Sequence, residues 1–277
     1  MSKNDSLGDR MKFYEKNFSS EKLMPLLPVL IRLDGVAFHT FTKGLARPYD
    51  ERLSKLMVDT TKYLTKLTGA RVGYTQSDEI SLVLFGDEFE DQLFFDGKKS
   101  KIISVLAARC SIFFNSLLRY VIPEKADKEP VFDCRVWNVP NKEEAVNSLI
   151  WREKDATRNS ISMAAQSCYS HSQLQNKSSN EMQELLHQKG INWNDYPTFF
   201  KRGTYIQKKI IVRPFTTSEL SSLPAKHEAH ANPNLTISRT DFAEVDMPIL
   251  TKIVNRAGVV FDGETPQLQN DLVIEIK

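Results

Sequence analysis

Residues 29–35 are Val-Leu-Ile-Arg-Leu-Asp-Gly, and residues 73–85 are Gly-Tyr-Thr-Gln-Ser-Asp-Glu-Ile-Ser-Leu-Val-Leu-Phe. Each stretch contains a strand-like apolar run with acid at one end. Asp34 ends the first run, and Asp78-Glu79 begin the second. If these strands lie side by side, the carboxylates meet at one edge of a sheet. Such an edge can hold a pair of Mg²⁺ ions and a nucleoside triphosphate.

The segments around these stretches predict alternating strands and helices. The spacing of the apolar residues predicts strands at 28–33, 70–75, 80–85 and 131–139, with amphipathic helices at 48–69 and 102–121. The order strand, helix, strand, strand, helix, strand is that of the α+β, ferredoxin-like βαββαβ core. In that core the first and third strands are antiparallel neighbours. The topology therefore places Asp34 and Asp78 at the same sheet edge.

The remaining segments flank this core. We expect a polar helical arm at 1–24, helices at 141–190, two strands within 191–213, a loop at 214–236, and a tail with a helix at 248–257 and a strand at 259–261. The chain thus divides into residues 1–140, which form the core and its N-terminal arm, and residues 141–277. The second region is expected to be a helical and mixed C-terminal extension that packs on the core.

Composition narrows the possible functions. Of 277 residues, 41% are hydrophobic and 26% charged, which is typical of a globular protein with a substantial core. The net charge is only +2, so any nucleic-acid surface must be a local patch. The three cysteines are far apart and form no Cys-x-x-Cys pair, which argues against a disulfide framework or a zinc ribbon. Because we expect neither a signal peptide nor a bilayer-spanning segment, we predict a cytoplasmic protein that does not associate with a membrane.

The dipeptides that contain Asp34 and Asp78 have a second interpretation. Asp34-Gly35 and Ser77-Asp78 are also typical of ordinary turns. A metal site is favoured because the predicted topology brings both aspartates to one edge of the sheet. Gly35 frees the backbone to turn, so that residues Val36 to His39 can point their N–H groups at a phosphate.

Basic residues mark two further candidate surfaces. Lys98-Lys99-Ser100-Lys101 stand where a helix begins, and a bound anion such as a triphosphate would offset the unfavourable placement of lysines there. The alternative is an exposed basic loop. Four residues later in the chain are candidates for RNA contacts, namely Arg158, Asn159, Lys201 and Arg202. Their alternative is incidental surface charge.

Several of these segments together resemble the tRNA(His) guanylyltransferase family, which comprises reverse (3′-to-5′) polymerases. The similarity covers roughly residues 10–210. Its strongest pieces are Arg32-Leu33-Asp34-Gly35-x-x-Phe38-His39, Gln76-Ser77-Asp78-Glu79-x-Ser81, Lys98-x-Ser100-Lys101, Phe132-Asp133-x-Arg135-Val136 and Trp151-Arg152-x-x-Asp155. No single one of them is specific, but the set is.

The resemblance implies a polymerase-palm core and a defined set of site residues. Asp34, the Gly35 carbonyl and Asp78 would bind two Mg²⁺ ions, and Glu79 would complete the catalytic set by supporting the site. By the same resemblance, the nucleotide would be held by Asp34, Gly35, Val36, Ala37, Phe38, His39, Ser77 and Asp78, with its triphosphate on Lys98, Ser100 and Lys101. The Lys201-Arg202-Gly203 segment matches a basic, RNA-facing one. Members of the family are typically homotetramers.

The reaction that the resemblance implies has two steps. A 5′-monophosphate on tRNA is activated with ATP or GTP, and the 3′-hydroxyl of an incoming GTP then attacks the activated end. Enzymes acting strictly on tRNA(His) carry His-Ile-Asn-Asn after the Trp-Arg motif, whereas this chain has Thr157-Arg158-Asn159-Ser160. This difference resembles the branch that repairs truncated tRNA 5′ ends against the opposite strand.

We therefore expect a Mg²⁺-dependent nucleotidyltransferase that adds nucleotides, chiefly guanylate, to the 5′ end of tRNA. Three alternatives stay open: strict addition of one G to tRNA(His), a nucleotidyl cyclase, and a non-catalytic tRNA-binding protein. The intact acids argue against the last, because unpaired carboxylates repel phosphate.

Overall fold

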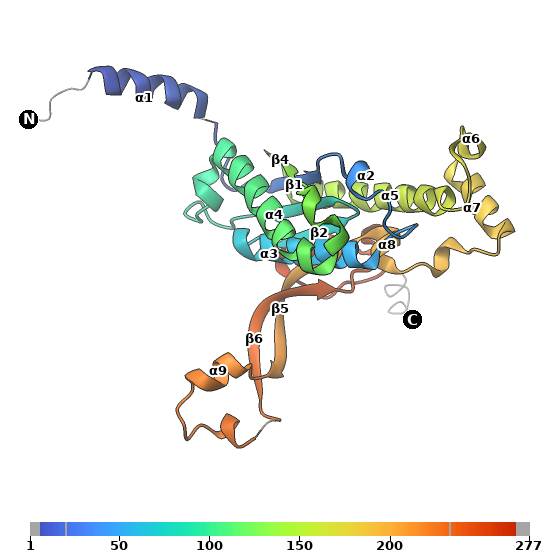
Figure 1. The fold of residues 1–277 in the computed structure, drawn as a ribbon. Coiled ribbons are helices and arrows are strands. Elements are labelled where there is room, and N and C mark those ends of the chain that lie inside the picture. The colour runs from blue at the N-terminus through green and yellow to red at the C-terminus, as the bar shows by residue number, and fades with distance from the viewer. Residues whose placement is uncertain (1–5, 20, 233, 270–277) are drawn as a thin grey trace, which may run out of the picture.

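The fold is seen in a computed structural model that describes residues 6–19, 21–232 and 234–269 (Figure 1). Its centre is a six-stranded sheet in the order β4-β1-β3-β2-β5-β6, and every neighbouring pair is antiparallel. The strands are β1 (Val29–Gly35), β2 (Val72–Gln76), β3 (Glu79–Leu84), β4 (Phe132–Asn138), β5 (Thr204–Pro214) and β6 (Thr236–Val245). The prediction that the first and third strands are antiparallel neighbours is confirmed.

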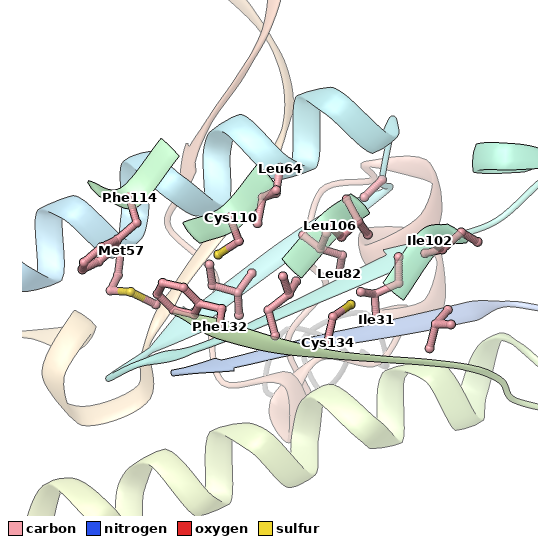
Figure 2. Packing of buried hydrophobic residues seen from close by; sticks show 14 of the residues in the cluster. Ile31, Met57, Leu64, Leu82, Ile102, Leu106, Cys110, Phe114, Phe132 and Cys134 are labelled. Carbon is pink, nitrogen blue, oxygen red and sulfur yellow. The ribbon is translucent and has the colours of Figure 1, made fainter. Parts of the chain in front are cut away.

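The two faces of β1 have different roles because side chains alternate along a strand. Ile31 and Leu33 point into an apolar layer formed with α3 (Glu51–Thr68) and α4 (Lys99–Val121), as Figure 2 shows for Ile31. Leu30 belongs to a second apolar cluster, formed with α5 (Lys142–Gln166) and α10 (Arg256–Asp262) on the other face. Arg32 and Asp34 share the side of Leu30, so they face α5.

Local signals at the ends of α3 explain its position. Asp50 precedes the helix, and its carboxylate accepts a hydrogen bond of 3.0 Å from the N–H of Arg52. This is an N-cap, which satisfies one of the free donors of the first turn. Gly69 ends the helix in the left-handed conformation, at φ 66°. The predicted helix at 48–69 is therefore confirmed to within a few residues.

Helix α4 carries the apolar stripe that closes the first layer. Its buried side chains recur every four residues, at Ile102, Leu106, Cys110, Phe114 and Leu118. By length and composition alone this helix is apolar enough to cross a membrane. In the fold its apolar stripe packs against the sheet, as in the core helix of a globular protein. Pro123 follows the helix, as expected.

The C-terminal half joins the same sheet, and several predictions for it were wrong. Strand β5 pairs with β2, and β6 pairs with β5 along ten residues. Residues 191–213 contain one strand rather than two, and it follows the short helix α8 (Thr198–Arg202). The predicted loop at 214–236 includes α9 (Thr217–Ser222), at the tip of the β5–β6 ribbon that extends from the body in Figure 1.

The tail was predicted least well. Residues 259–261 lie in α10 rather than in a strand, and the predicted helix at 248–257 is mostly a 3-10 turn (Leu250–Lys252) and loop. Short apolar runs do not distinguish a buried strand from a buried helix. The expected helices at 141–190 are present as α5, α6 (His171–Leu174) and α7 (Ser179–Gln188), and the N-terminal arm contains α1 (Ser6–Ser19). The division of the chain at residue 140 stays a prediction.

Candidate active site

Asp34 and Asp78 meet at one edge of the sheet, as the topology predicts. Asp34 is opposite Glu79 in the register of β1 and β3. Asp78 lies in the tight turn between β2 and β3, where Ser77 has φ 55°. The N–H of Gly35 donates a hydrogen bond of 3.1 Å to the carbonyl of Asp78. This bond ties the end of β1 to the turn that carries the second acid.

Two cavities meet at these acids. The larger, of about 560 Å³, lies between the β2–β3 turn, residues 34–54 and α8. The smaller, of about 360 Å³, lies between the same turn and α5. Both are lined by Asp34, Gln76, Ser77 and Asp78. A group bound in one cavity therefore lies beside a group bound in the other, with the carboxylates between them.

Asp34, Asp78 and Glu79 form what we call the acid edge of the sheet, and its electrostatics favour a bound cation. Burial raises the pKa of Asp78, and the charge of Asp34 raises it further. The two carboxylates are thus close enough to repel each other in their ionised forms. A cation between them would relieve this repulsion.

The donor set suits Mg²⁺. The described part of the chain holds no cluster of three or more His, Cys, Asp and Glu side chains able to bind a metal. Mg²⁺ sites often use only one or two protein carboxylates and are completed by substrate phosphates and water, so the chemistry of Asp34 and Asp78 fits this ion. The expected contribution of the Gly35 carbonyl stays a prediction.

The loop after Asp34 is shaped by packing as well as by any ligand. The N–H of Val36 donates to the carbonyl of Val131 at 2.9 Å, so it is not available to a phosphate, contrary to expectation. Phe38 points into the core, and a Cβ on Gly35 would lie 2.2 Å from its ring. Ala37, at φ 55°, leads into the short helix α2 (Phe38–Phe41), whose first N–H groups have no helical partners. His39 is exposed and bonds to Thr40.

Lys98, Ser100 and Lys101 lie at the opposite end of the strands. The N–H of Leu23, which precedes β1, donates to the carbonyl of Gly97 at 2.8 Å. Helix α4 then runs toward the acid edge, so that Phe114 packs on Phe132 near Gly35, and Figure 2 shows Ile102 at the far end. The length of β1, roughly 17 Å from Val29 to Asp34 at about 3.4 Å per residue, separates the two places. One chain does not bring these basic residues together with the acids.

The candidate RNA residues fall on two neighbouring helices. Arg158 and Asn159 are exposed on α5, where Asp155 binds both, and Asn159 lines the smaller cavity. Lys201 lies on α8 over the ring of Trp193, and its carbonyl is 3.4 Å from the hydroxyl of Thr157 on α5. Arg202 lines a separate cavity.

Two arginines of the site were not predicted as functional. Arg32 and Arg152 both contact the carboxylate of Glu79, at 2.6 and 2.7 Å. Burial raises the pKa of Glu79, while both arginines oppose that shift. The sequence contained one indication that Arg32 is functional, because it is a charged residue within the apolar run of β1. The aromatic wall of the larger cavity, which includes Tyr49, Phe199 and Phe200, gave no comparable signal.

Comparison with known proteins shows the family of this chain. The family model described as tRNAHis guanylyltransferase matches residues 8–140. A solved bacterial tRNA(His) guanylyltransferase-like protein in complex with ATP is 36% identical, with a TM-score of 0.73, and the match covers 89% of this chain and 94% of that one. The chain belongs to the tRNA(His) guanylyltransferase-like family.

Two further relatives support this assignment. A bacterial tRNA(His) guanylyltransferase-like protein solved in complex with GTP is 34% identical, with a TM-score of 0.69 over 90% of this chain and 95% of that one. The tRNA(His) guanylyltransferase of Saccharomyces cerevisiae is 28% identical over 71% of this chain and 89% of its own length. Members of the family are nucleotidyltransferases, so this chain is a nucleotidyltransferase.

Proposed function

We propose that the protein is a Mg²⁺-dependent 3′-to-5′ nucleotidyltransferase that adds nucleotides, chiefly guanylate, to the 5′ end of tRNA. The observation that carries the proposal is the meeting of two cavities at Asp34 and Asp78. One cavity is available for a nucleoside triphosphate and the other for the 5′ end of an RNA. The ATP and GTP complexes of the bacterial relatives support the choice of nucleotides.

We infer that the first four strands with α3 and α4 form a ferredoxin-like polymerase palm. Their order, β4-β1-β3-β2, and the placement of both helices on one face support this inference. The acids then occupy the sheet edge that faces the substrates.

The reaction would proceed in two balanced steps. An oxygen of the RNA 5′-monophosphate attacks the α-phosphorus of ATP or GTP, forms a 5′–5′ pyrophosphate link and releases pyrophosphate. The 3′-hydroxyl of an incoming GTP then attacks the RNA 5′-phosphorus, loses its proton, and displaces AMP or GMP. Mg²⁺ held by Asp34 and Asp78 would lower the pKa of the attacking hydroxyl and neutralise charge on the leaving oxygen. The nucleotide base is expected against the aromatic wall of the larger cavity.

The physiological role proposed is template-dependent repair of truncated tRNA 5′ ends. The segment Thr157-Arg158-Asn159-Ser160 supports it, because it lacks the His expected of an enzyme restricted to tRNA(His). Asn159 lines the smaller cavity and Arg158 is exposed beside it on α5, where both can contact RNA phosphates.

A homo-oligomer, expected to be a tetramer, would complete the nucleotide site. Lys98, Ser100 and Lys101 are exposed at the far end of the strands. If they bind a triphosphate in this reaction, they do so in the site of a second copy. A chain acting alone would leave the triphosphate without them.

The direct test is extension of RNA. The protein is incubated with 5′-monophosphorylated tRNA lacking its first nucleotide, together with ATP, GTP and Mg²⁺, and we expect products longer by one or more nucleotides. Full-length tRNA(His) transcript is the comparison substrate, since preference for it would indicate strict G addition. No extension of either RNA would contradict the proposal, and a cyclic nucleotide formed without RNA would indicate a cyclase.

The first variant to test is Asp78→Ala. Loss of a metal-binding carboxylate removes several kcal/mol of transition-state stabilisation, so extension should fall at least about a hundredfold. The fold should persist, because Asp78 lies in a turn at the sheet edge, and circular dichroism checks this. The control is Asp87→Ala, which removes an aspartate from a loop beyond the other end of β3. Normal extension by Asp78→Ala would exclude Asp78 from the metal site.

A further inference from the structure

Arg32 lies between two carboxylates at the acid edge. Its Nη2 atom is 2.6 Å from Oε2 of Glu79 and 3.4 Å from Oδ2 of Asp34. The geometry follows from the sheet, since Arg32 and Asp34 are two residues apart on β1 and share a face, while Glu79 is opposite Asp34 on β3. One guanidinium nitrogen is thus within reach of both acids, and the contact with Glu79 is the shorter.

Glu79 is itself held from a second side. Nη1 of Arg152 lies 2.7 Å from the same Oε2 atom. Arg152 is only 7% exposed, packs 3.7 Å from the centre of the Trp151 ring, and lies 3.4 Å from Asp155. The other oxygen of Glu79, Oε1, is buried and has no hydrogen-bond partner in the described residues. Both guanidinium groups therefore bind the same oxygen of Glu79, and its other oxygen binds neither.

Asp34 is needed for a different partner. It is one of the two carboxylates proposed to hold Mg²⁺, and a guanidinium bonded to it would compete with the metal for the same oxygens. We propose that Glu79 is a positioning residue, rather than a metal ligand, and that its short contact with Arg32 keeps the contact between Arg32 and Asp34 long and weak. Arg152 fixes Glu79 for this role. The inference rests on the metal site of the proposed function.

The test is the binding of Mn²⁺ to the full-length protein without nucleotide, measured from the electron paramagnetic resonance signal of the free ion. Mn²⁺ is the probe because it prefers the same oxygen ligands as Mg²⁺. Glu79→Gln keeps the size of the side chain and removes its charge. Arg32 is then expected to move closer to Asp34 than the present 3.4 Å, and the dissociation constant for Mn²⁺ should rise on the order of tenfold. Adding Arg32→Met should return it close to the wild-type value.

A second double variant separates this mechanism from a simple change of charge. Glu79→Gln with Arg152→Met has the same net charge as Glu79→Gln with Arg32→Met, but it leaves Arg32 free to reach Asp34. We expect recovery only when Arg32 is replaced. Equal recovery in both would show that local charge alone sets the affinity. Persistent weak binding in both would make Glu79 a metal ligand. Either result overturns the inference, as does wild-type affinity in Glu79→Gln.

Two further measurements keep the test decisive. If Glu79→Gln does not fold by circular dichroism, Arg32→Met alone is compared with the wild type. Its affinity for Mn²⁺ should be equal or higher, and a lower affinity would overturn the inference. Asp78→Ala tests the metal site separately. Equal binding by the wild type and Asp78→Ala would remove the site itself, whatever Glu79 does.

Discussion

Neighbouring residues in this chain can have opposite surroundings. Leu33 is fully buried, whereas the side chain of Asp34, one residue later, is about a third exposed at the acid edge. The same contrast holds for the cysteines. Cys110 and Cys134 are buried in the layer beneath α4, and Cys168 is partly exposed near the end of α5.

The cysteines give a prediction at this scale. Burial raises the pKa of the Cys134 thiol to about 12 and that of Cys110 higher still. Thiols react as thiolates, so neither should be alkylated by iodoacetamide at pH 8 in the folded protein. Cys168 should react first, as peptide mass spectrometry will show. In denaturant all three should react, which is the control. Labelling of Cys134 at the rate of Cys168 would contradict the fold.

Asp50 gives a second prediction, because it caps α3 and binds the side chain of Arg52 at 2.8 Å. Asp50→Ala should lower the free energy of unfolding by about 1–2 kcal/mol, measured by urea denaturation. Asp50→Asn keeps a capping oxygen and should lose less. Equal losses in the two variants would mean that the cap contributes little.

The effect of Asp50 should depend on pH. Hydrogen bonds from Arg52 lower the pKa of this carboxyl in the folded protein. Its stabilising contribution is therefore complete above the unfolded-state pKa, near 3.8, and is lost as the pH falls toward the folded-state value. The stability difference between wild type and Asp50→Ala should shrink below about pH 4.

At the scale of elements, the junction of α8 and β5 depends on Gly203. It has φ 82°, and a Cβ there would lie 2.6 Å from the carbonyl oxygen of Thr75 and against the ring of Tyr74. Gly203→Ala should therefore destabilise the protein by about 3 kcal/mol or more. Gly190→Ala is the matched control. It also has positive φ but has open space around it, and should cost only about 1 kcal/mol. Similar losses would contradict the close packing.

The sequence was most informative where apolar periodicity and turn residues agreed. The first four strands, α3 and α4 were predicted, and so was the convergence of Asp34 with Asp78, because the topology allows few alternatives. Strand β6 was not. Its residues alternate little in polarity, and none of them is buried, so no buried face marks it as a strand. The resemblance placed Lys98 on the same triphosphate as the acids, but β3 begins at the acids and Lys98 follows its other end, so the strand order separates them within one chain.

At the scale of the whole molecule, the basic residues at the start of α4 and the acids lie too far apart for one chain to use both on one triphosphate. Neither Asp78→Ala nor the double variant Lys98→Ala, Lys101→Ala should then extend tRNA well alone. If the two variant proteins are mixed and reassembled into oligomers, some sites receive intact acids from one chain and intact lysines from the other. The mixed oligomers should therefore recover a fraction of wild-type activity in the extension assay. No recovery, despite mixed oligomers seen by native mass spectrometry, would exclude a shared site.

The alternation of side chains along β1 also governs which length changes the gene can tolerate. One extra codon between Leu30 and Leu33 would turn the side chain of Asp34 into the apolar layer between the sheet and α4, and that of Leu33 toward the two cavities. Folding and chemistry would fail together. An in-frame insertion beside α9, a helix without buried residues at the tip of the β5–β6 ribbon, should leave both intact. Natural length variation among relatives should therefore gather there.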